Sequence, residues 1–177
     1  MCMIETTSAI ETRRLTLRAP DMADSWRMAE LMSDWDIARM TSSVPHPYSQ
    51  GDAEDFVARV QANDPRRDRN FVIELEGEGL VGGIGFFTPE NGLLEVGYWI
   101  GRAWWGRGIA TEALQGALMW AAGDWRKRLV VAGHFADNPA SGQVLVKAGF
   151  LYTGETRRAF SRARKADIDT RMMVWLA

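Results

Sequence analysis

The chain has 177 residues, of which 46% are hydrophobic and 25% are charged, a composition typical of a soluble globular protein. With 21 basic and 23 acidic side chains the net charge is −2, which excludes a general attraction to nucleic acid or to an anionic membrane. A single cysteine, Cys2, excludes an internal disulfide, and we interpret it as incidental in a frayed terminus; two histidines argue against a metal site. No apolar run approaches the roughly 20 residues of a membrane span. We therefore expect one domain over residues 1–177, in the cytoplasm.

The first part of the chain predicts a strand followed by two helices. Polar and apolar side chains alternate over residues 11–19, which indicates a half-buried strand ending at Pro20. Asp21 is a typical helix cap, and the helix after it has an apolar face made of Trp26, Ala29 and Met32. Ser49 or Asp52 begins a second helix, whose inward side chains are Phe56, Val57 and Val60.

Turn signals divide the middle of the chain into antiparallel strands. Residues 71–75 and 80–88 flank a Gly-Glu-Gly turn and predict a hairpin, and the turn over residues 89–92 leads into a strand over 93–100. The remaining elements are, in chain order, a helix over 111–122, a strand over 129–135, a helix over 138–147, and strands over 150–154 and 168–175. We expect the helix over 138–147 to end in a left-handed residue at Gly149.

The most informative stretch, residues 104–112, lies between a predicted strand and a predicted helix. Gly106 and Gly108 permit a sharp turn that points several backbone N–H groups at one spot, at the positive end of the helix dipole, where a pyrophosphate is favoured. A P-loop would need Lys and then Ser or Thr after its last glycine, but Ile-Ala follows Gly108. A dinucleotide-binding motif would need Gly or Ala at Thr111 and parallel strands, which the predicted hairpins contradict.

The residues around these glycines resemble the central motif of the GNAT acetyltransferases, in the branch typified by RimJ and RimL. The resemblance runs over residues 95–114 and reads EVGYWIGRAWWGRGIATEAL. The superfamily pattern of Gln or Arg, two residues, Gly, one residue, then Gly or Ala begins here at Trp105, which departs from it. A second block, Asn138-Pro-Ala-Ser141 and then residues 144–150, is similar to that branch's N-x-x-S and K-x-G-F segment. With residues 13–18 and the Pro-Tyr pair at 47–48, the similarity covers residues 11–175.

The resemblance implies a mixed α+β fold with helices on both faces of a sheet. The sheet is expected to be twisted, mostly antiparallel and seven-stranded, splayed between strands four and five, with acetyl-CoA in the gap as co-substrate and no metal. The backbone of the fourth strand would pair with the pantetheine arm through Tyr98, Trp99 and Ile100. The pyrophosphate would be held by Trp105, Gly106, Arg107, Gly108, Ile109, Ala110 and Thr111. Two of these have alternatives: Arg107 as a solvated loop residue and Thr111 as a helix cap.

The same resemblance assigns catalytic roles. Glu95 is the expected general base, with a solvated strand carboxylate or a salt-bridge partner as the alternative. Ser141 is the expected proton donor to the leaving thiolate, and Asn138 is expected to bond the pantetheine amide; for both, capping of the helix over 138–147 is the alternative. For Tyr152 we expect core packing. Core packing and lining of an acceptor cleft both stay open for Trp26, Trp35, Trp99, Trp104 and Trp105.

The acceptor is an amine, and the sequence favours one that is easily deprotonated. Neither His46 nor His134 stands at an obvious cleft position, so a strong base is absent from the expected site. An α-amine near pKa 7.7–8.0 therefore fits better than a lysine near 10.4. A small-molecule amine acetyltransferase and a non-catalytic acyl-CoA-binding module stay open as alternatives. Residues 157–165 would form a solvated loop or a positive lip, and the oligomeric state, a homodimer included, is not fixed by the sequence.

Overall fold

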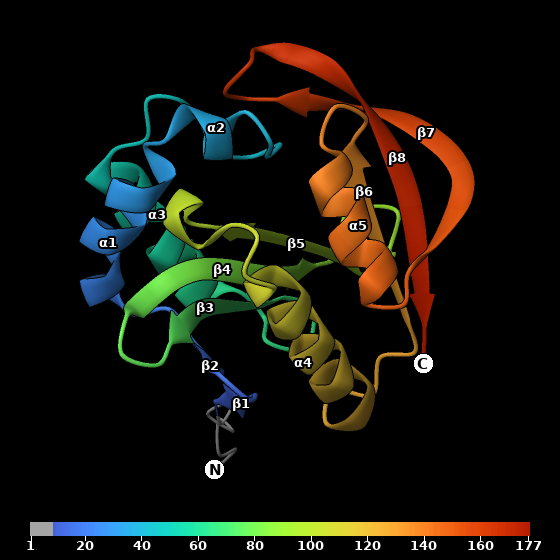
Figure 1. Ribbon diagram of the computed structural model, residues 1–177, viewed down its shortest axis with the longest axis horizontal. Coiled ribbons are helices and arrows are strands. Elements are labelled where there is room, and N and C mark those ends of the chain that lie inside the picture. Colours follow the sequence, from blue (N-terminus) through green and yellow to red (C-terminus); the bar gives the residue numbers. More distant parts are fainter. Residues whose placement is uncertain (1–8) are drawn as a thin grey trace.

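Within residues 9–177, the part that the computed structural model describes, eight strands form one sheet in the order β1-β2-β3-β4-β5-β6-β8-β7 (Figure 1). The strands are β1 (Ile10–Glu11), β2 (Leu15–Arg18), β3 (Arg69–Leu75), β4 (Gly79–Phe87), β5 (Glu95–Ile100), β6 (Leu129–Phe135), β7 (Leu151–Ser161) and β8 (Ala166–Leu176). The helices are η1 (Met22–Asp24), α1 (Ser25–Met32), α2 (Trp35–Ala38), α3 (Gln50–Ala62), η2 (Arg102–Trp104), α4 (Ile109–Gly123) and α5 (Pro139–Lys147).

The mixed α+β prediction is confirmed, but the described sheet has eight strands where seven were expected. The additional strand is β1. The chain reverses over residues 12–14, where the backbone N–H of Thr12 donates to the Leu15 carbonyl at 2.9 Å, and β1 then pairs with β2. Alternation alone predicted one strand over residues 11–19, because this turn contains neither glycine nor proline to mark it.

The sheet opens between β5 and β6, as expected for strands four and five. Every other neighbouring pair is antiparallel, whereas β5 and β6 are parallel and share one registered pair, Glu95 with Val131. The N–H of Val131 donates to the carbonyl of Leu94 at 2.8 Å beside that pair. Beyond it β5 continues to Ile100 and β6 to Phe135 without further pairing, so the two strands diverge from Glu95 onward.

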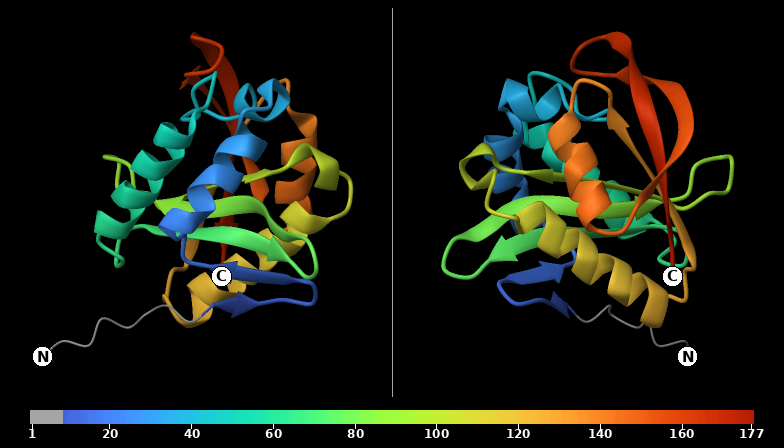
Figure 2. Two further views of the ribbon diagram at one scale, coloured as in Figure 1. Left: turned by 90° about the vertical axis from the view of Figure 1, so that its left-hand side faces the viewer. Right: turned by 45° about the vertical axis from the view of Figure 1, so that its right-hand side comes forward.

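Two clusters of buried side chains hold the helices on opposite faces of the sheet (Figures 1 and 2). The larger one joins the strands to α4 and α5, and includes Leu114, Leu118, Leu145 and Phe150. The smaller one joins α1 and α3 to β3 and β4, and includes Met28, Val57, Val72 and Leu80. Along β5, Val96 and Ile100 belong to the α4/α5 cluster, whereas Trp99 packs against the α1/α3 cluster, as alternation along a strand requires.

Helix ends agree with the expected capping residues. Asp21 caps η1, which leads into α1, and Ser49 caps α3 in a capping box with Asp52. Gly149 has φ 95°, the left-handed conformation expected after α5. The predicted inward face of the first helix is wrong at Trp26, which is 59% exposed.

The segment expected as a loop over residues 157–165 is the end of β7 and a tight turn into β8. This hairpin curves toward α2 in Figure 1, and its tip contacts residues 39–43. Arg164 donates to the carbonyl of Arg39 at 2.6 Å and pairs with Asp137 at 2.6 Å, while the N–H of Arg162 donates to the carbonyl of Ser42 at 3.0 Å. The expectation of a solvated loop is therefore wrong, because these contacts fix the tip.

Two negative findings hold for residues 9–177. None of their helices has the length and apolar content to cross a membrane. No three of their His, Cys, Asp and Glu side chains gather where they would hold a metal ion. Cys2, which the sequence analysis interprets as incidental, lies outside these residues.

Candidate active site

The glycine turn before α4 leaves the first N–H groups of that helix without a side-chain cap. Gly106 and Gly108 have φ values of 74° and 75°, a left-handed conformation that glycine adopts without steric cost. Gly108 is the N-cap of the 15-residue α4, and within residues 9–177 no side chain caps the first turn. The alternative that Thr111 caps this helix is wrong, because Thr111 lies inside it. The turn therefore presents backbone donors at the positive end of a long helix.

The residues on either side of the turn are tied to neighbouring strands. Arg107 pairs with Glu78 of the β3–β4 turn at 3.1 Å, and its side chain remains exposed. The indole N–H of Trp104 also bonds Glu78, and these two contacts, that of Trp104 first, hold the pKa of the Glu78 carboxyl below its usual value. Trp105 donates from its indole to the carbonyl of Ile100 at 2.7 Å, so this carbonyl of β5 already has a partner.

A tyrosine–serine contact spans the divergence of β5 and β6. The Tyr98 hydroxyl lies 2.9 Å from Oγ of Ser141 and 3.1 Å from its carbonyl oxygen, to which the phenol can only donate. Burial raises the pKa of Tyr98 to about 12, with the Ser141 hydrogen bond opposing it, so the phenol stays protonated near pH 7. Sequence reasoning treated Tyr98 only as backbone and missed this contact. The signal was present, because Tyr98 shares a face of β5 with buried Val96 and Ile100.

The structure assigns the capping of α5 to Asn138 and not to Ser141. Asn138 is the N-cap of α5, and its Oδ1 accepts from the backbone N–H of Ser141 at 3.3 Å. Capping by Ser141 is therefore wrong, since its hydroxyl is turned to Tyr98 instead. Pro139 at the first helical position fixes the start of α5 and with it the position of this hydroxyl.

Glu95 stands where β5 and β6 begin to part. Its side chain is half-buried, and no hydrogen bond or ion pair reaches its carboxylate from the described residues. Burial raises the pKa of Glu95, and the positive charge of Arg157 opposes part of that rise. Arg157 itself is paired with Glu155 at 2.6 Å, so its charge is partly compensated. A carboxylate with a raised pKa is a stronger base than one in water.

The carboxylate and the serine hydroxyl belong to opposite faces of the sheet. Alternation along β5 puts Glu95 on the face of Trp99, toward α1 and α3, whereas Tyr98 reaches Ser141 on the α4/α5 face. Because β5 and β6 share no pair beyond Glu95, a group held between them has access to both faces.

Other singled-out side chains fall outside this arrangement. The expectation of core packing for Tyr152 is wrong: it is half exposed, and its hydroxyl lies 3.0 Å from Nε2 of buried His134. His46 packs its ring edge-on against Trp35. Of the five tryptophans that the sequence analysis names, Trp104 is buried and Trp99 packs against the α1/α3 cluster. The other three are exposed: Trp26, Trp35 and Trp105.

We predict that Glu95→Gln stabilises the fold in a pH-dependent way. Burial raises the pKa of Glu95 in the folded protein above its value in the unfolded chain, about 4.3. Below that unfolded pKa the carboxyl is protonated in both states and burial carries no ionisation penalty. Above the folded pKa the carboxyl is ionised in both states and the full penalty applies. Urea unfolding should therefore give the variant a higher free energy of unfolding at pH 7, with a gain that vanishes as the pH falls below about 4. Exposed Glu90→Gln is the control, and a gain independent of pH would contradict the assignment.

The sequence of this chain matches a known family and its members. The family model of the acetyltransferase (GNAT) domain matches residues 14–151. The ribosomal-protein-serine acetyltransferase of Escherichia coli (strain K12) is 32% identical over 126 residues, which cover 68% of this chain and 70% of that protein.

Solved structures show the same fold. RimL, an alpha-N-protein acetyltransferase in complex with coenzyme A, has a TM-score of 0.81 at 21% identity, over 96% of this chain and 98% of that one. Spermidine N-acetyltransferase from Vibrio cholerae, in complex with CoA and spermine, has a TM-score of 0.77 at 21% identity, over 93% and 96%. With the family match over most of its length, the chain belongs to the GNAT acetyltransferases and has RimJ/RimL-like relatives.

Proposed function

We propose that this enzyme transfers the acetyl group of acetyl-CoA to a primary amine, preferably the α-amine of a peptide or protein, within one domain over residues 1–177. The observation that supports the proposal is the position of Glu95 where β5 and β6 part, together with the Ser141 hydroxyl that Tyr98 of β5 contacts. One is a carboxylate with a raised pKa and the other a hydroxyl, on opposite faces of the sheet. A ribosomal-protein acceptor, as in the named relatives, would put the enzyme in the cytoplasm.

In this proposal acetyl-CoA enters from the α4/α5 face. Its pyrophosphate accepts hydrogen bonds from the N–H groups of the turn from Trp105 to Thr111, and its pantetheine arm lies along β5 as an added strand. Alternation along β5 turns the backbone groups of Tyr98 toward the gap and those of Trp99 toward β4, and the carbonyl of Ile100 already accepts from Trp105, so the pairing with pantetheine falls mainly to Tyr98. The side-chain amide of Asn138, whose oxygen caps α5, has its N–H groups available for the pantetheine amide.

The reaction needs one proton removed from the amine and one supplied to the leaving thiolate. The amine nitrogen attacks the thioester carbonyl, the N–C bond forms, and the C–S bond breaks as the tetrahedral intermediate collapses. Glu95 takes the proton from nitrogen on the α1/α3 face, and Ser141 gives its hydroxyl proton to the departing thiolate on the other. Once the products leave, Glu95 releases its proton to water and Ser141 takes one from water, so the enzyme returns to its starting state. The Tyr98 phenol is protonated near pH 7 and has one proton; when it gives that proton to Oγ of Ser141 instead of to the Ser141 carbonyl, the serine proton is free to point toward sulfur.

An α-amine suits this base better than a lysine side chain. At pH 7 deprotonation costs an α-amine about 1 kcal/mol and a lysine about 4–5 kcal/mol. The raised pKa of Glu95 makes it a moderate base, which meets the first cost more readily than the second. Polyamines are the second candidate class, because the fold is shared with a spermidine N-acetyltransferase.

We predict that Gly108→Ala weakens acetyl-CoA binding while Gly92→Ala does not. Both glycines have φ near 75°, and neither added methyl group would meet an atom within 3.4 Å, so the backbone strain is matched. Only Gly108 lies at the start of α4. Titration calorimetry should show about a tenfold loss for Gly108→Ala, equal to about 1.4 kcal/mol of anion binding. Equal affinities in the two variants would count against the proposed phosphate site.

We predict that Ser141→Ala lowers kcat by roughly 10–10³, the range of general acid catalysis, and leaves the affinity for acetyl-CoA nearly unchanged. Exposed Gln143→Ala on the same helix is the control. Steady-state release of CoA and thermal unfolding are measured on both variants. A lower stability with an unaltered kcat would show that Ser141 only supports α5.

We predict acetylation of α-amines in preference to lysine at neutral pH. Two peptides of one sequence are compared, one with a free N-terminus and a blocked lysine, the other reversed, with spermine as a third acceptor. Mass spectrometry should find acetate on the first peptide. Preferential labelling of lysine would require a stronger base than Glu95, and labelling of spermine alone would favour the small-molecule class.

A further inference from the structure

We propose that Arg14 is a positioning residue for the pyrophosphate-binding turn, acting through Glu112 and through the backbone carbonyl of Arg107. Neither the β1–β2 hairpin, which contains Arg14, nor Glu112 has a part in the mechanism above. The inference rests on the proposed function, because it concerns how the turn is prepared for the pyrophosphate of CoA.

Glu112, in the first turns of α4, is the anchor for the hairpin. Its Oε1 accepts from the hydroxyl of Thr12 at 2.8 Å and from the backbone N–H of Arg14 at 2.8 Å. Its Oε2 accepts from Nε of Arg14 at 2.7 Å. Three donors on one carboxylate, two of them from side chains, fix the guanidinium of Arg14 beside the start of α4.

Arg14 then reaches the glycine turn itself. Its Nη2 donates to the carbonyl oxygen of Arg107 at 3.1 Å. The Arg107–Gly108 peptide is trans, so its C=O and N–H groups point in opposite directions. Holding the carbonyl on the Arg14 side therefore directs the N–H of Gly108 to the other side. Because glycine tolerates many backbone conformations, this peptide would otherwise rotate readily.

The ion pair between Arg14 and Glu112 also compensates a negative charge near the proposed phosphate site. Burial alone would raise the pKa of Glu112, but the hydrogen bonds from Thr12 and Arg14 outweigh it and lower the pKa, so the carboxylate is ionised near pH 7. An unpaired carboxylate in the first turns of α4 would repel a pyrophosphate at the same helix end. Arg14 compensates that charge.

Close packing seats the hairpin on α4. A Cβ atom at Gly116, one turn beyond Glu112, would lie 2.6 Å from the Thr12 methyl group, so the approach depends on glycine there.

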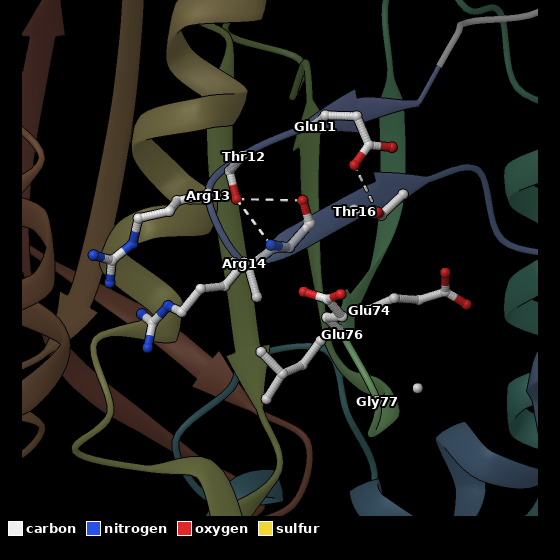
Figure 3. Close-up of a pocket in the computed structure, with 11 residues that line it drawn as sticks. Glu11, Thr12, Arg13, Arg14, Thr16, Glu74, Glu76 and Gly77 are labelled. Carbon is white, nitrogen blue, oxygen red and sulfur yellow. Dashed lines mark hydrogen bonds between the residues drawn. The ribbon is translucent and has the colours of Figure 1, made fainter.

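An open depression of about 560 Å³ adjoins the hairpin, between the β1–β2 and β3–β4 turns (Figure 3). Figure 3 shows Arg13 and Arg14 both pointing away from Glu74 and Glu76, yet only Arg14 of the two has hydrogen bonds to α4 or the turn among the described residues. Arg13 is therefore a matched control.

The experiment compares Arg14→Ala, Arg14→Lys and Arg13→Ala by calorimetric titration with CoA. We expect affinity about tenfold weaker for Arg14→Ala, the order expected for misaligning one hydrogen bond to a charged group, and unchanged for Arg13→Ala. Arg14→Lys keeps the charge and the backbone bond to Glu112, but one ammonium cannot replace the fork that reaches both Glu112 and Arg107. It should therefore also bind CoA more weakly.

A second readout separates positioning from general stability. S-acetylpantetheine carries the thioester without the pyrophosphate, so kcat/KM for this substrate should be the same in all three variants and the wild type. Equal losses with acetyl-CoA and S-acetylpantetheine would overturn the inference, as would unchanged CoA affinity in Arg14→Ala. Absence of CoA binding in the wild type would instead defeat the proposed function, so the two failures are distinguishable.

Discussion

The rest of the site depends on a sheet that stops pairing after one residue. β5 and β6 are neighbours through Glu95 and Val131 only, and beyond them the facing backbone groups have no partner strand. Buried backbone donors and acceptors must be satisfied, so this separation is costly unless something fills it. In the binding mode that we propose, an extended amide-bearing chain such as pantetheine supplies the missing hydrogen bonds, as an added strand would.

The separation is maintained from outside the sheet. On one face the Tyr98 phenol bridges β5 to α5. At the far end of β6, Arg164 at the tip of the β7–β8 hairpin stacks over Phe135 and bonds both Asp137 and the chain after α2. The first contact fixes α5 to β5, and Arg164 joins the end of β6 to the chain after α2. Arg164 is thus a structural tie, where the sequence suggested a solvated loop or a positive lip.

At the phosphate site that we propose, the nearby charges are paired so that most of the binding falls to the backbone. The nearby arginines are already paired, Arg107 with Glu78 and Arg14 with Glu112, and the chain as a whole carries a net charge of −2. A pyrophosphate therefore meets the N–H groups of an uncapped helix first, with Arg107 available only in exchange for Glu78. Anion binding by N–H groups depends on their direction, which gives the hydrogen bond from Arg14 to the turn its importance.

The sequence predicted elements well where punctuation and periodicity agree, as in β6, whose bounds are those expected, and α4, where Leu114 and Leu118 are buried. It failed where the chain turns without glycine or proline, at residues 12–14, and where basic residues continue a strand, as Arg157 and Arg158 do in β7. The glycine turn before α4 could be predicted because glycine adopts positive φ without steric cost, and Gly106 and Gly108 do so. Alternation along β5 indicates the face on which Tyr98 lies, but its partner Ser141, 43 residues away, is set by tertiary packing that no local pattern encodes.

In the reaction that we propose, the burial that makes Glu95 a stronger base also limits what it can deprotonate. Desolvation raises the pKa of its carboxyl toward that of an α-ammonium group, so the proton moves over a smaller free-energy difference, while a lysine ammonium lies about 2.5 units higher still. Further burial would strengthen the base, but it would also enlarge the cost of holding the carboxylate ionised in the folded protein. Arg157 limits that cost by its positive charge. A moderate base matched to an easily deprotonated amine is the compromise that these opposing terms favour.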